Sequence, residues 1–398
     1  MPFTPQMSTP HKTVASLAER LTAYAVLAHD LAVPQIAADY WAKSEDHYRA
    51  VDAALADLVT WAPQALGAYK QVLADPTHTG AQHTLREHLI DLLTHYTDQQ
   101  AGLADVVTEA DRHIWVDYHL GADYTAQAPK SALAVPVTRA RTEDSQVHVV
   151  IPFHDHPGGL RTRNLLACLY ALADQEGGPA YRVTVVETDI EPRTRAALEG
   201  AVDDYVFAYK DGLFNKAWAV NVGVVEAGAD AMYTCILDAD ILVDRHFVAS
   251  NAARLSEGGH GTHLPFRWSL SLDEPSTQRA LTLRTREGIA NVPGSVLRGL
   301  LLREPPGGCV WLRTKVLHAV GGFDERYEGW GGEDDDVIAR LAATAPLVRY
   351  DDALLHLNHP RPAMTRDDGA PFNNHIEPLS WTGADGYGDQ LKFSVPTA

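Results

Sequence analysis

The sequence predicts an α/β domain at residues 147–362, preceded by an all-helical domain at residues 1–130. Two observations lead to this prediction. From residue 13 to residue 126 the apolar side chains recur at helical spacing, whereas from residue 147 short β-branched runs alternate with helical stretches. A run rich in proline and alanine separates the two patterns, so we expect a linker at residues 131–146. Residues 363–398 form the expected C-terminal tail.

The helical domain contains three or more amphipathic stretches, including LAERLTAYAVLAHDLAV and TLREHLIDLLTHYTDQQAGLADVV. Proline or glycine interrupts the pattern near Pro34, near Pro63 and at residues 75–80. None of these stretches has catalytic spacing. We therefore expect residues 1–130 to serve packing, formation of a homodimer, or recognition of an acceptor.

The α/β domain begins with the strand HVVIPF, the helix LRTRNLLACLYALADQ and the strand RVTVVET. The next stretches predict a helix in EPRTRAALEGA, a strand in DDYVFAY, a helix in FNKAWAVNVGVVEAGA and a strand in MYTCILDADIL. This alternation builds a parallel sheet, and such sheets bind ligands at the carboxyl ends of their strands. Residues 268–303 are expected to add a helix and a mobile acceptor or lid loop.

Charge and cysteine content disfavour several classes of function. The 398 residues include 33 basic and 52 acidic side chains, with a formal net charge of -19, which disfavours nucleic acid as a partner. Cys168, Cys235 and Cys309 show no zinc-binding or redox spacing, so we expect buried free thiols. No stretch is apolar for long enough to span a bilayer. We therefore expect a cytoplasmic protein without a membrane span.

Two motifs offer ligands for a metal ion. Asp238 and Asp240 close the strand MYTCIL, where both carboxylates approach one metal or a metal-bound diphosphate. A plain turn is the alternative, since Asp-x-Asp is common by chance. His356 and His359, three residues apart, can converge on one metal, although single histidines are more often ordinary polar side chains.

The string GWGGEDDD at residues 329–336 is the most specific motif. Placed before the helix VIARLAA, its acids can stabilise the helix dipole, but that role explains one or two acids and not four. Its glycines suit a backbone shaped around a ligand. Trp330 offers a flat face for the apolar surface of a sugar.

These motifs resemble the β-1,4-galactosyltransferase family of inverting glycosyltransferases with the GT-A fold. The resemblance runs over residues 147–362 and is also carried by residues 151–153, by residues 214–217 and by Gly307 with Gly308. It implies a GT-A-type, Rossmann-like mixed sheet flanked by helices.

The resemblance also implies roles for individual residues. Asp240, His356 and His359 would bind Mn²⁺ or another divalent cation such as Mg²⁺, with His356 standing where the family carries methionine. Asp334 would be the catalytic base. The remaining residues would contact the nucleotide sugar; they are Pro152, Phe153, His156, Glu187, Phe214, Lys216, Asp238, Gly308, Trp330 and Glu333.

Two departures from the family pattern affect the donor site. The family has basic residues after Pro-Phe, where this chain has residues 154–156, so Arg161 or Arg163 is expected to substitute. The aromatic residue that the family carries ahead of Gly-Gly is replaced by Pro305 or Pro306. Loss of a ring predicts more room beside the donor sugar.

The function expected from these motifs is that of a metal-dependent inverting hexosyltransferase. It would move a hexose or N-acetylhexosamine from a UDP-sugar to a hydroxyl of a glycan, peptide or small molecule. Two alternatives stay open. One is a retaining enzyme of the polypeptide N-acetylgalactosaminyltransferase type, and the other is a catalytically silent nucleotide-sugar-binding protein.

Overall fold

A computed structural model describes residues 13–127, 144–155, 158–227 and 230–394. By contacts between Cα atoms the chain divides into two compact units. Unit 1 consists of Met1–Pro129, Trp268–Ala280 and Pro293–Arg303, and unit 2 of Lys130–Arg267, Leu281–Val292 and Glu304–Ala398. Two stretches of the predicted domain at residues 147–362 thus belong to the unit that contains the N-terminal helices.

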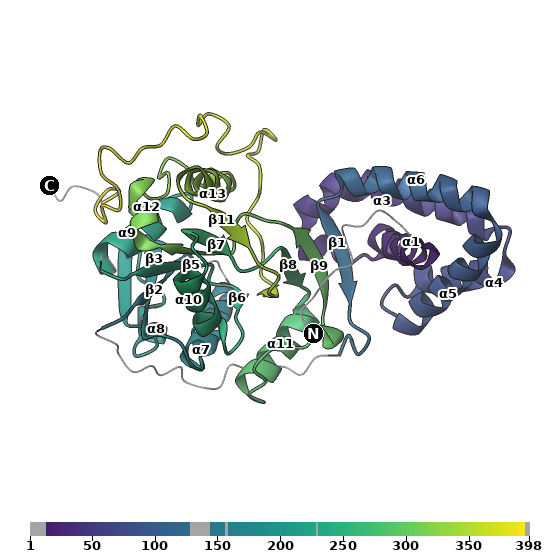
Figure 1. The fold of residues 1–398 in the computed structure, drawn as a ribbon, viewed down its shortest axis with the longest axis horizontal. Coiled ribbons are helices and arrows are strands. Elements are labelled where there is room, and N and C mark those ends of the chain that lie inside the picture. Colours follow the sequence, from purple (N-terminus) through teal and green to yellow (C-terminus); the bar gives the residue numbers. More distant parts are fainter. Residues whose placement is uncertain (1–12, 128–143, 156–157, 228–229, 395–398) are drawn as a thin grey trace. The chain divides into compact units, whose positions relative to one another are not determined.

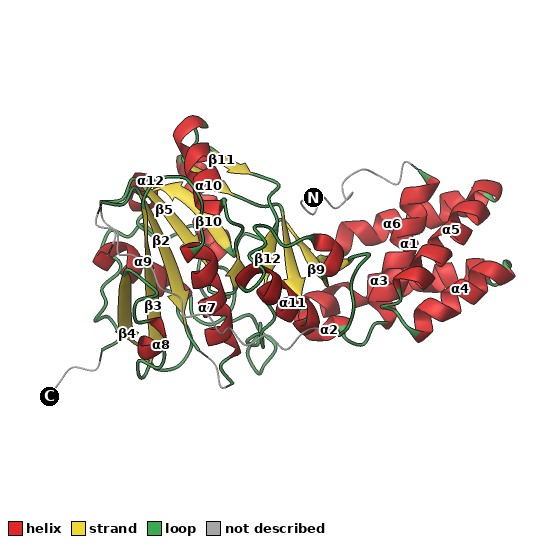
Figure 2. Cartoon of the chain, turned by 90° about the horizontal axis from the view of Figure 1, so that it is seen from below, coloured by secondary structure: helices red, strands yellow, loops and turns green. Residues whose placement is uncertain are grey.

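The described part of unit 1 is mainly a helical bundle, drawn in red in Figure 2. Its first helix begins with a capping box, in which the Thr13 hydroxyl accepts a hydrogen bond from the Ser16 backbone at 3.1 Å. The apolar stripes of the helices meet in one core that fully buries Leu21, Leu55 and Leu89. The helices are α1 (Val14–His29), α2 (Val33–Ile36), α3 (Ala38–Val59), α4 (Pro63–Ala74), α5 (Thr79–His95) and α6 (Thr97–His113).

Unit 1 also contains three antiparallel strands that the helical pattern did not predict. Strand β1 (Val116–Leu120) pairs with β9 (Arg298–Arg303), which pairs with β8 (Trp268–Leu272). The sequence predicted helix as far as residue 126, but α6 ends at His113 and the next residues pair with a partner about 180 positions away. Tertiary pairing therefore overrides the local pattern.

The described part of unit 2 is built on a seven-stranded mixed sheet with helices around it (Figure 1). Strands β2, β3, β4 and β5 run parallel, whereas β10 runs antiparallel to β5 and β7. The predicted mixed α/β fold is confirmed. In spatial order the strands are β11 (Leu347–Arg349), β7 (Thr262–Leu264), β10 (Cys309–Arg313), β5 (Tyr233–Leu237), β2 (Val147–Phe153), β3 (Tyr181–Asp189) and β4 (Asp204–Tyr209).

The helices of unit 2 follow the predicted alternation, with one shortened. The predicted helix EPRTRAALEGA is helical only over Arg195–Leu198, because Gly200 turns the chain with a φ of 76°. Cys168, Cys235 and Cys309 are buried free thiols, as predicted. The helices are α7 (Leu160–Ala173), α8 (Arg195–Leu198), α9 (Lys216–Ala227), α10 (Phe247–Glu257), α12 (Thr314–Ala319) and α13 (Glu333–Thr344), while α11 (Glu274–Thr285) begins in unit 1 and ends in unit 2.

The predicted strand MYTCILDADIL is divided in two. Strand β5 ends at Leu237, a turn follows, and β6 (Ile241–Leu242) continues the chain and pairs antiparallel with β12 (Leu354–His356). The turn carries Asp238 and Asp240, so both carboxylates lie beyond the carboxyl end of a central strand.

The C-terminal segment (residues 363–394), yellow in Figure 1, passes α12 and α13. Hydrogen bonds fasten it to unit 2: the Trp381 indole donates to the Gly321 carbonyl at 2.8 Å, and the Trp218 indole donates to the Asp389 carbonyl at 2.8 Å. Among the described residues, none of the helices combines the length and the hydropathy that crossing a bilayer requires. The homodimer predicted through residues 1–130 receives no support from the part of the chain that the structure describes.

Candidate active site

Three predicted metal ligands lie together at the turn after β5. Each of Asp240, His356 and His359 offers one ligand atom, and these atoms lie within 4.8 Å of one another. The pairing of β6 with β12 sets His356 opposite Ile241, and the Leu357 amide donates to the Asp240 carbonyl at 2.9 Å. The Nε2 atoms of His356 and His359 lie 3.5 and 2.8 Å from the Asp240 carboxylate.

The chemistry of this cluster fits a divalent cation. Asp240 Oδ1 and His359 Nε2 are buried without a hydrogen-bond partner, which is costly unless a further group binds them. The Pro360 carbonyl lies 2.9 Å from His359 Nδ1. A carbonyl only accepts, so Nδ1 carries a proton, and an Nε2 without a proton would offer its lone pair to a metal. Burial lowers the pKa of His356 to about 3, so the His356 imidazole is neutral at pH 7.

Next to the cluster, one ammonium group joins two carboxylates from distant parts of the chain. Lys216, at the start of α9, lies 2.9 Å from Asp238 Oδ1 and 2.9 Å from Asp334 Oδ2. Burial acts to lower the pKa of Lys216, but Asp238 and Asp334 outweigh it and raise that pKa well above its ordinary value. Lys216 is therefore charged.

Asp334 lies in the first turn of α13, which begins inside the acidic motif and not after it. The four acids at residues 333–336 all belong to this turn. Residue 307 must be a glycine to leave room for the Asp334 carboxylate, because a Cβ atom on Gly307 would lie 2.1 Å from Asp334 Oδ2. Gly308 has a φ of 102°, and its carbonyl accepts a hydrogen bond from the Asp238 amide at 3.0 Å. The Gly-Gly pair thus shapes the space between the two carboxylates.

The glycine-rich loop (residues 328–332) leads into α13 and carries Trp330. Gly329, Gly331 and Gly332 have φ values of 72°, 90° and 98°, a backbone region that favours glycine. A Cβ on Gly332 would lie 2.5 Å from the Tyr327 ring, so the motif requires glycine there for two reasons.

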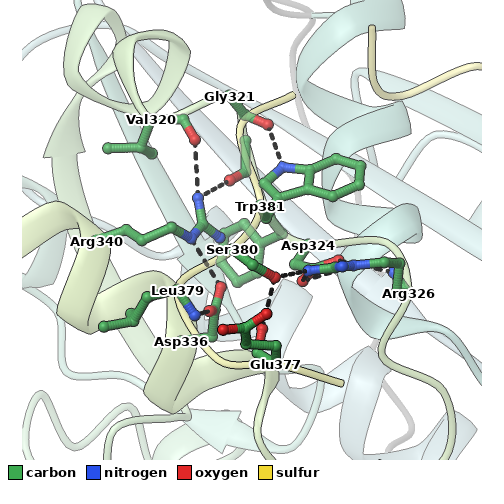
Figure 3. A network of polar contacts seen from close by, with 12 residues as sticks. Val320, Gly321, Asp324, Arg326, Asp336, Arg340, Glu377, Leu379, Ser380 and Trp381 are labelled. Atoms are coloured by element: carbon green, nitrogen blue, oxygen red, sulfur yellow. Dashed lines mark hydrogen bonds and ion pairs between the residues drawn. The ribbon is translucent and has the colours of Figure 1, made fainter. Parts of the chain in front are cut away.

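The other acids of the motif divide into two kinds. Asp336 is buried and structural, since it accepts hydrogen bonds from Arg340 Nε at 2.7 Å and from the Leu379 amide at 2.8 Å (Figure 3). Glu333 is different: burial, and then the charge of Asp334, raise its pKa to about 8. At neutral pH the Glu333 carboxyl group is mainly protonated and can donate a hydrogen bond.

The raised pKa of Glu333 predicts a pH-dependent stability. Between the ordinary pKa of 4.5 and about pH 8, the folded protein keeps a proton that the unfolded chain releases. This contribution to the free energy of unfolding is fully present below pH 4.5 and is lost as the pH rises through about 8. Glu333→Gln lacks this contribution. The melting temperature of the variant minus that of the wild type should therefore increase from pH 6 to pH 8 and stay constant above about pH 8. A constant difference from pH 6 to pH 9.5 would contradict the assignment.

The predicted nucleotide contacts are distributed unevenly. Phe214 stacks on His154, with ring centroids 5.7 Å apart, and its carbonyl accepts a hydrogen bond from the Gly329 amide at 2.8 Å. Pro152 and Phe153 lie in the buried strand β2, and Phe153 is only 2% exposed. The side chain of Phe153 therefore packs in the core. His156 lies outside the described residues.

Glu187, another predicted contact, is used by the protein itself. Its carboxylate accepts hydrogen bonds from the Thr194 hydroxyl at 2.6 Å, the Arg193 amide at 3.0 Å and the Tyr205 hydroxyl at 2.5 Å. The side chain is fully buried. In this structure Glu187 holds the turn before α8, a role that no local motif indicates.

Of Arg161 and Arg163, Arg161 is the better candidate to replace the basic residues that the related family has after Pro-Phe. Its guanidinium donates to the His154 carbonyl at 3.3 Å, while its Nε is buried without a hydrogen-bond partner. Burial lowers the pKa of Arg161, and the charges of Asp240 and Asp238 act against this, which places the group beside the Asp-x-Asp turn. Arg163 instead donates to the Asn358 carbonyl at 2.8 Å and so supports the loop between the two histidines.

Comparison with known proteins finds matches to glycosyltransferases. A family model described as glycosyl transferase family 2 matches residues 148–321, and a model described as the N-terminal domain of galactosyltransferase matches residues 302–359. Bovine β-1,4-galactosyltransferase 1 is 27% identical over 145 residues, which cover 36% of this chain and 29% of the relative. The human protein of the same name is 28% identical over 131 residues, which cover 33% and 26%.

Solved structures of low similarity are also found. The catalytic domain of Drosophila β1,4-galactosyltransferase 7, in complex with xylobiose, has a TM-score of 0.40 at 17% identity and covers 61% of this chain and 84% of that one. Residues 1–349 of S. aureus TarS, in complex with UDP-GlcNAc, have a TM-score of 0.38 at 13% identity and cover 54% and 59%. The chain spans less than a third of the length of the curated relatives. The two family models and the two curated relatives confirm the predicted resemblance, and the chain carries glycosyltransferase family matches over residues 148–321 and 302–359.

Proposed function

We propose that this chain is a metal-dependent inverting hexosyltransferase that moves a hexose or N-acetylhexosamine from a UDP-sugar to an acceptor hydroxyl. The observation that carries the proposal is the cluster of Asp240, His356 and His359, in which two buried ligand atoms lack a hydrogen-bond partner. The Lys216 ammonium links Asp334 to the turn that carries Asp240, since it lies 2.9 Å from Asp334 Oδ2 and 2.9 Å from Asp238 Oδ1. The glycosyltransferase family matches over residues 148–321 and 302–359 support the same reaction class.

The three ligands would hold Mn²⁺ or a similar divalent cation. When bound, the ion would stabilise the negative charge that develops on the departing nucleotide diphosphate. The guanidinium of Arg161, whose Nε lacks a partner, would add positive charge on the same side. In the same proposal Phe214 and His154 flank the uracil ring of the donor. Trp330 covers the donor sugar, and the protonated Glu333 donates a hydrogen bond to a sugar oxygen.

Asp334 would take the proton of the attacking hydroxyl. The Lys216 ammonium lies 2.9 Å from Asp334 Oδ2, and Gly307, which has no side chain, leaves room beside the carboxylate. One carboxylate acting as base on the face opposite the leaving group gives inversion at the anomeric carbon, because no covalent glycosyl intermediate forms.

The proposal is tested by incubating the full chain with a panel of UDP-sugars and acceptors, with and without Mn²⁺, and by measuring UDP release. Nuclear magnetic resonance of the product then gives the anomeric configuration. We expect Mn²⁺-dependent transfer with inversion. Product with retained configuration would favour the retaining alternative, and UDP-sugar binding without turnover would favour a silent binding protein.

The donor site is expected to accept N-acetylated sugars at least as well as UDP-galactose. Pro305 or Pro306 stands where the related family has an aromatic ring. The buried Trp311 cannot take the place of that ring, because Trp311 is stacked on His263 in the core. An acetamido group would fill the space that the ring leaves. The comparison of kcat/KM for UDP-galactose, UDP-N-acetylgalactosamine, UDP-glucose and UDP-N-acetylglucosamine checks this.

Restoring a ring provides the matched control. Arg349 donates to the Pro305 carbonyl at 3.1 Å, so Pro306 is the position to change with the least disturbance of the turn. Pro306→Tyr should lower kcat/KM for the N-acetylated donors about tenfold relative to the unacetylated ones. A strong wild-type preference for either unacetylated sugar would overturn the steric argument.

A further inference from the structure

One side chain of the C-terminal segment holds the glycine-rich loop at three points. Asn373 Nδ2 donates to the Gly331 carbonyl at 2.8 Å and to the Trp330 carbonyl at 3.3 Å, while its Oδ1 accepts from the Glu328 amide at 3.1 Å. Both amide hydrogens and the amide oxygen are therefore used on one loop. Asn373 lies beyond residue 359, where the matches to both family models have ended.

The loop needs such support because of its composition. Three of its five residues are glycines with positive φ, and a Cβ on Gly331 would meet open space. Neighbouring side chains thus do not restrain Gly331, and glycine loses more conformational freedom on ordering than any other residue. Hydrogen bonds to the two carbonyls at residues 330 and 331 fix the peptide planes on the C-terminal side of Trp330 and just before α13.

The neighbours of Asn373 reinforce the same contact. A Cβ on Gly329 would lie 3.1 Å from the Phe372 ring, so this ring packs directly over the loop. Farther along, the Leu379 amide donates to Asp336 and the Trp381 indole to the Gly321 carbonyl, as Figure 3 shows. The segment is thus anchored on α13 and on the end of α12, and Asn373 extends from an anchored backbone.

We propose that Asn373 is a positioning residue, which orients Trp330 and the start of α13 for transfer. This inference rests on the proposed transferase function. Without the carboxamide, the peptide planes at residues 330 and 331 are free to rotate, and Trp330 and Asp334 lose their fixed spacing. Misplacement of a reacting or orienting group by about 1 Å lowers a rate by up to about a hundredfold.

The test compares three variants of the full chain. Asn373→Ala removes all three hydrogen bonds, and Asn373→Asp keeps the acceptor for the Glu328 amide but cannot donate to the carbonyls. Asn374→Ala is the matched control, because Asn374 is the exposed neighbour. Hydrogen exchange of the loop amides, melting temperature, and the kcat and KM values for donor and acceptor are measured for each.

We expect the amides of residues 328–332 to exchange about tenfold faster or more in Asn373→Ala, while the amide of Glu328 stays protected in Asn373→Asp. In both variants kcat/KM for the acceptor should fall about tenfold to a hundredfold, with KM for the donor nucleotide within about twofold of the wild type. Asn374→Ala should match the wild type throughout. If Asn373→Ala fails to fold, Asn373→Asp and its exchange pattern decide.

Each contrary result has a distinct meaning. Wild-type exchange rates in the loop of Asn373→Ala would show that the Asn373 hydrogen bonds do not hold the loop, whether or not the chain transfers sugar. Faster exchange with kinetics equal to those of Asn374→Ala would overturn the positioning role. A wild type that shows no transfer with any donor would refute the proposed function, and with it the positioning role in transfer. The exchange data would still decide whether Asn373 holds the loop.

Discussion

Removal of the divalent cation, by a chelator or by loss of a ligand, should abolish sugar transfer. The cation would offset charge on the leaving diphosphate, a contribution of several kcal/mol, so transfer should fall at least about a thousandfold in EDTA and in His359→Ala. Added Mn²⁺ should restore the wild type and not the variant. Asp240→Asn should behave similarly, since it removes the carboxylate that both imidazoles face at 3.5 and 2.8 Å.

The ligand assignment also has a readout that does not depend on turnover. Calorimetric titration with Mn²⁺ should give one site in the wild type and much weaker binding in His359→Ala. His246→Ala is the control, because His246 is exposed and its side chain makes no cap hydrogen bond at the start of α10. Full turnover of the metal-free enzyme, or wild-type Mn²⁺ affinity in His359→Ala, would refute the site.

The sequence predicted the parts of unit 2 whose signals are local. β-branched runs identified β2 and β3, and a carboxylate after the run YTCIL marked a strand end. The convergence of Asp240 with His356 and His359 followed from motif resemblance, but its physical cause is the pairing of β6 with β12, two short strands about 115 residues apart. Such short pairing leaves no periodic pattern in the sequence.

Other features depended on contacts that no local pattern records. Lys216 was predicted to offset phosphate charge, and no local pattern indicated its contacts with Asp238 and Asp334, which are 22 and 118 positions away. Glu187 was grouped with the nucleotide contacts, but its neighbours Thr194 and Tyr205 use its oxygens. A carboxylate at a strand end can serve a ligand or a turn, and only the three-dimensional neighbours distinguish the two.

The contacts of the C-terminal segment were also not predicted from the sequence. Its sequence has no helical or strand period, so it was predicted only as a C-terminal tail. The structure shows three of its residues, Asn373, Leu379 and Trp381, bound to the glycine-rich loop, to α13 and to Gly321. Individual polar contacts of this kind do not need periodic sequence, and a pattern-based reading therefore misses them.

Asp334→Asn should lower kcat by roughly a hundredfold or more while donor binding stays close to that of the wild type. Asparagine keeps the shape of the side chain but cannot take the proton of the acceptor hydroxyl, and general-base assistance is typically worth about 10² to 10⁴ in rate. The Lys216 ammonium keeps its contact with Asp238 at 2.9 Å, so its positive charge stays beside the Asp-x-Asp turn. Steady-state kcat at saturating donor, together with titration by UDP, measures the two effects separately.

The choice of control decides what this result means. Asp336→Asn would break the buried pair with Arg340, in which Nε lies 2.7 Å from the carboxylate, and so would lower stability for reasons unrelated to chemistry. Asp335 is exposed in the same helical turn and shares the interaction with the helix dipole, so Asp335→Asn removes an equal charge without touching the site. If the acids act only through the dipole, the two Asn variants at residues 334 and 335 should lose similar activity and similar stability. If Asp334 is the base, only its variant should lose kcat. Its melting temperature should fall below that of Asp335→Asn, because Asp334→Asn also loses the ion pair with Lys216, so kcat and not stability decides the role.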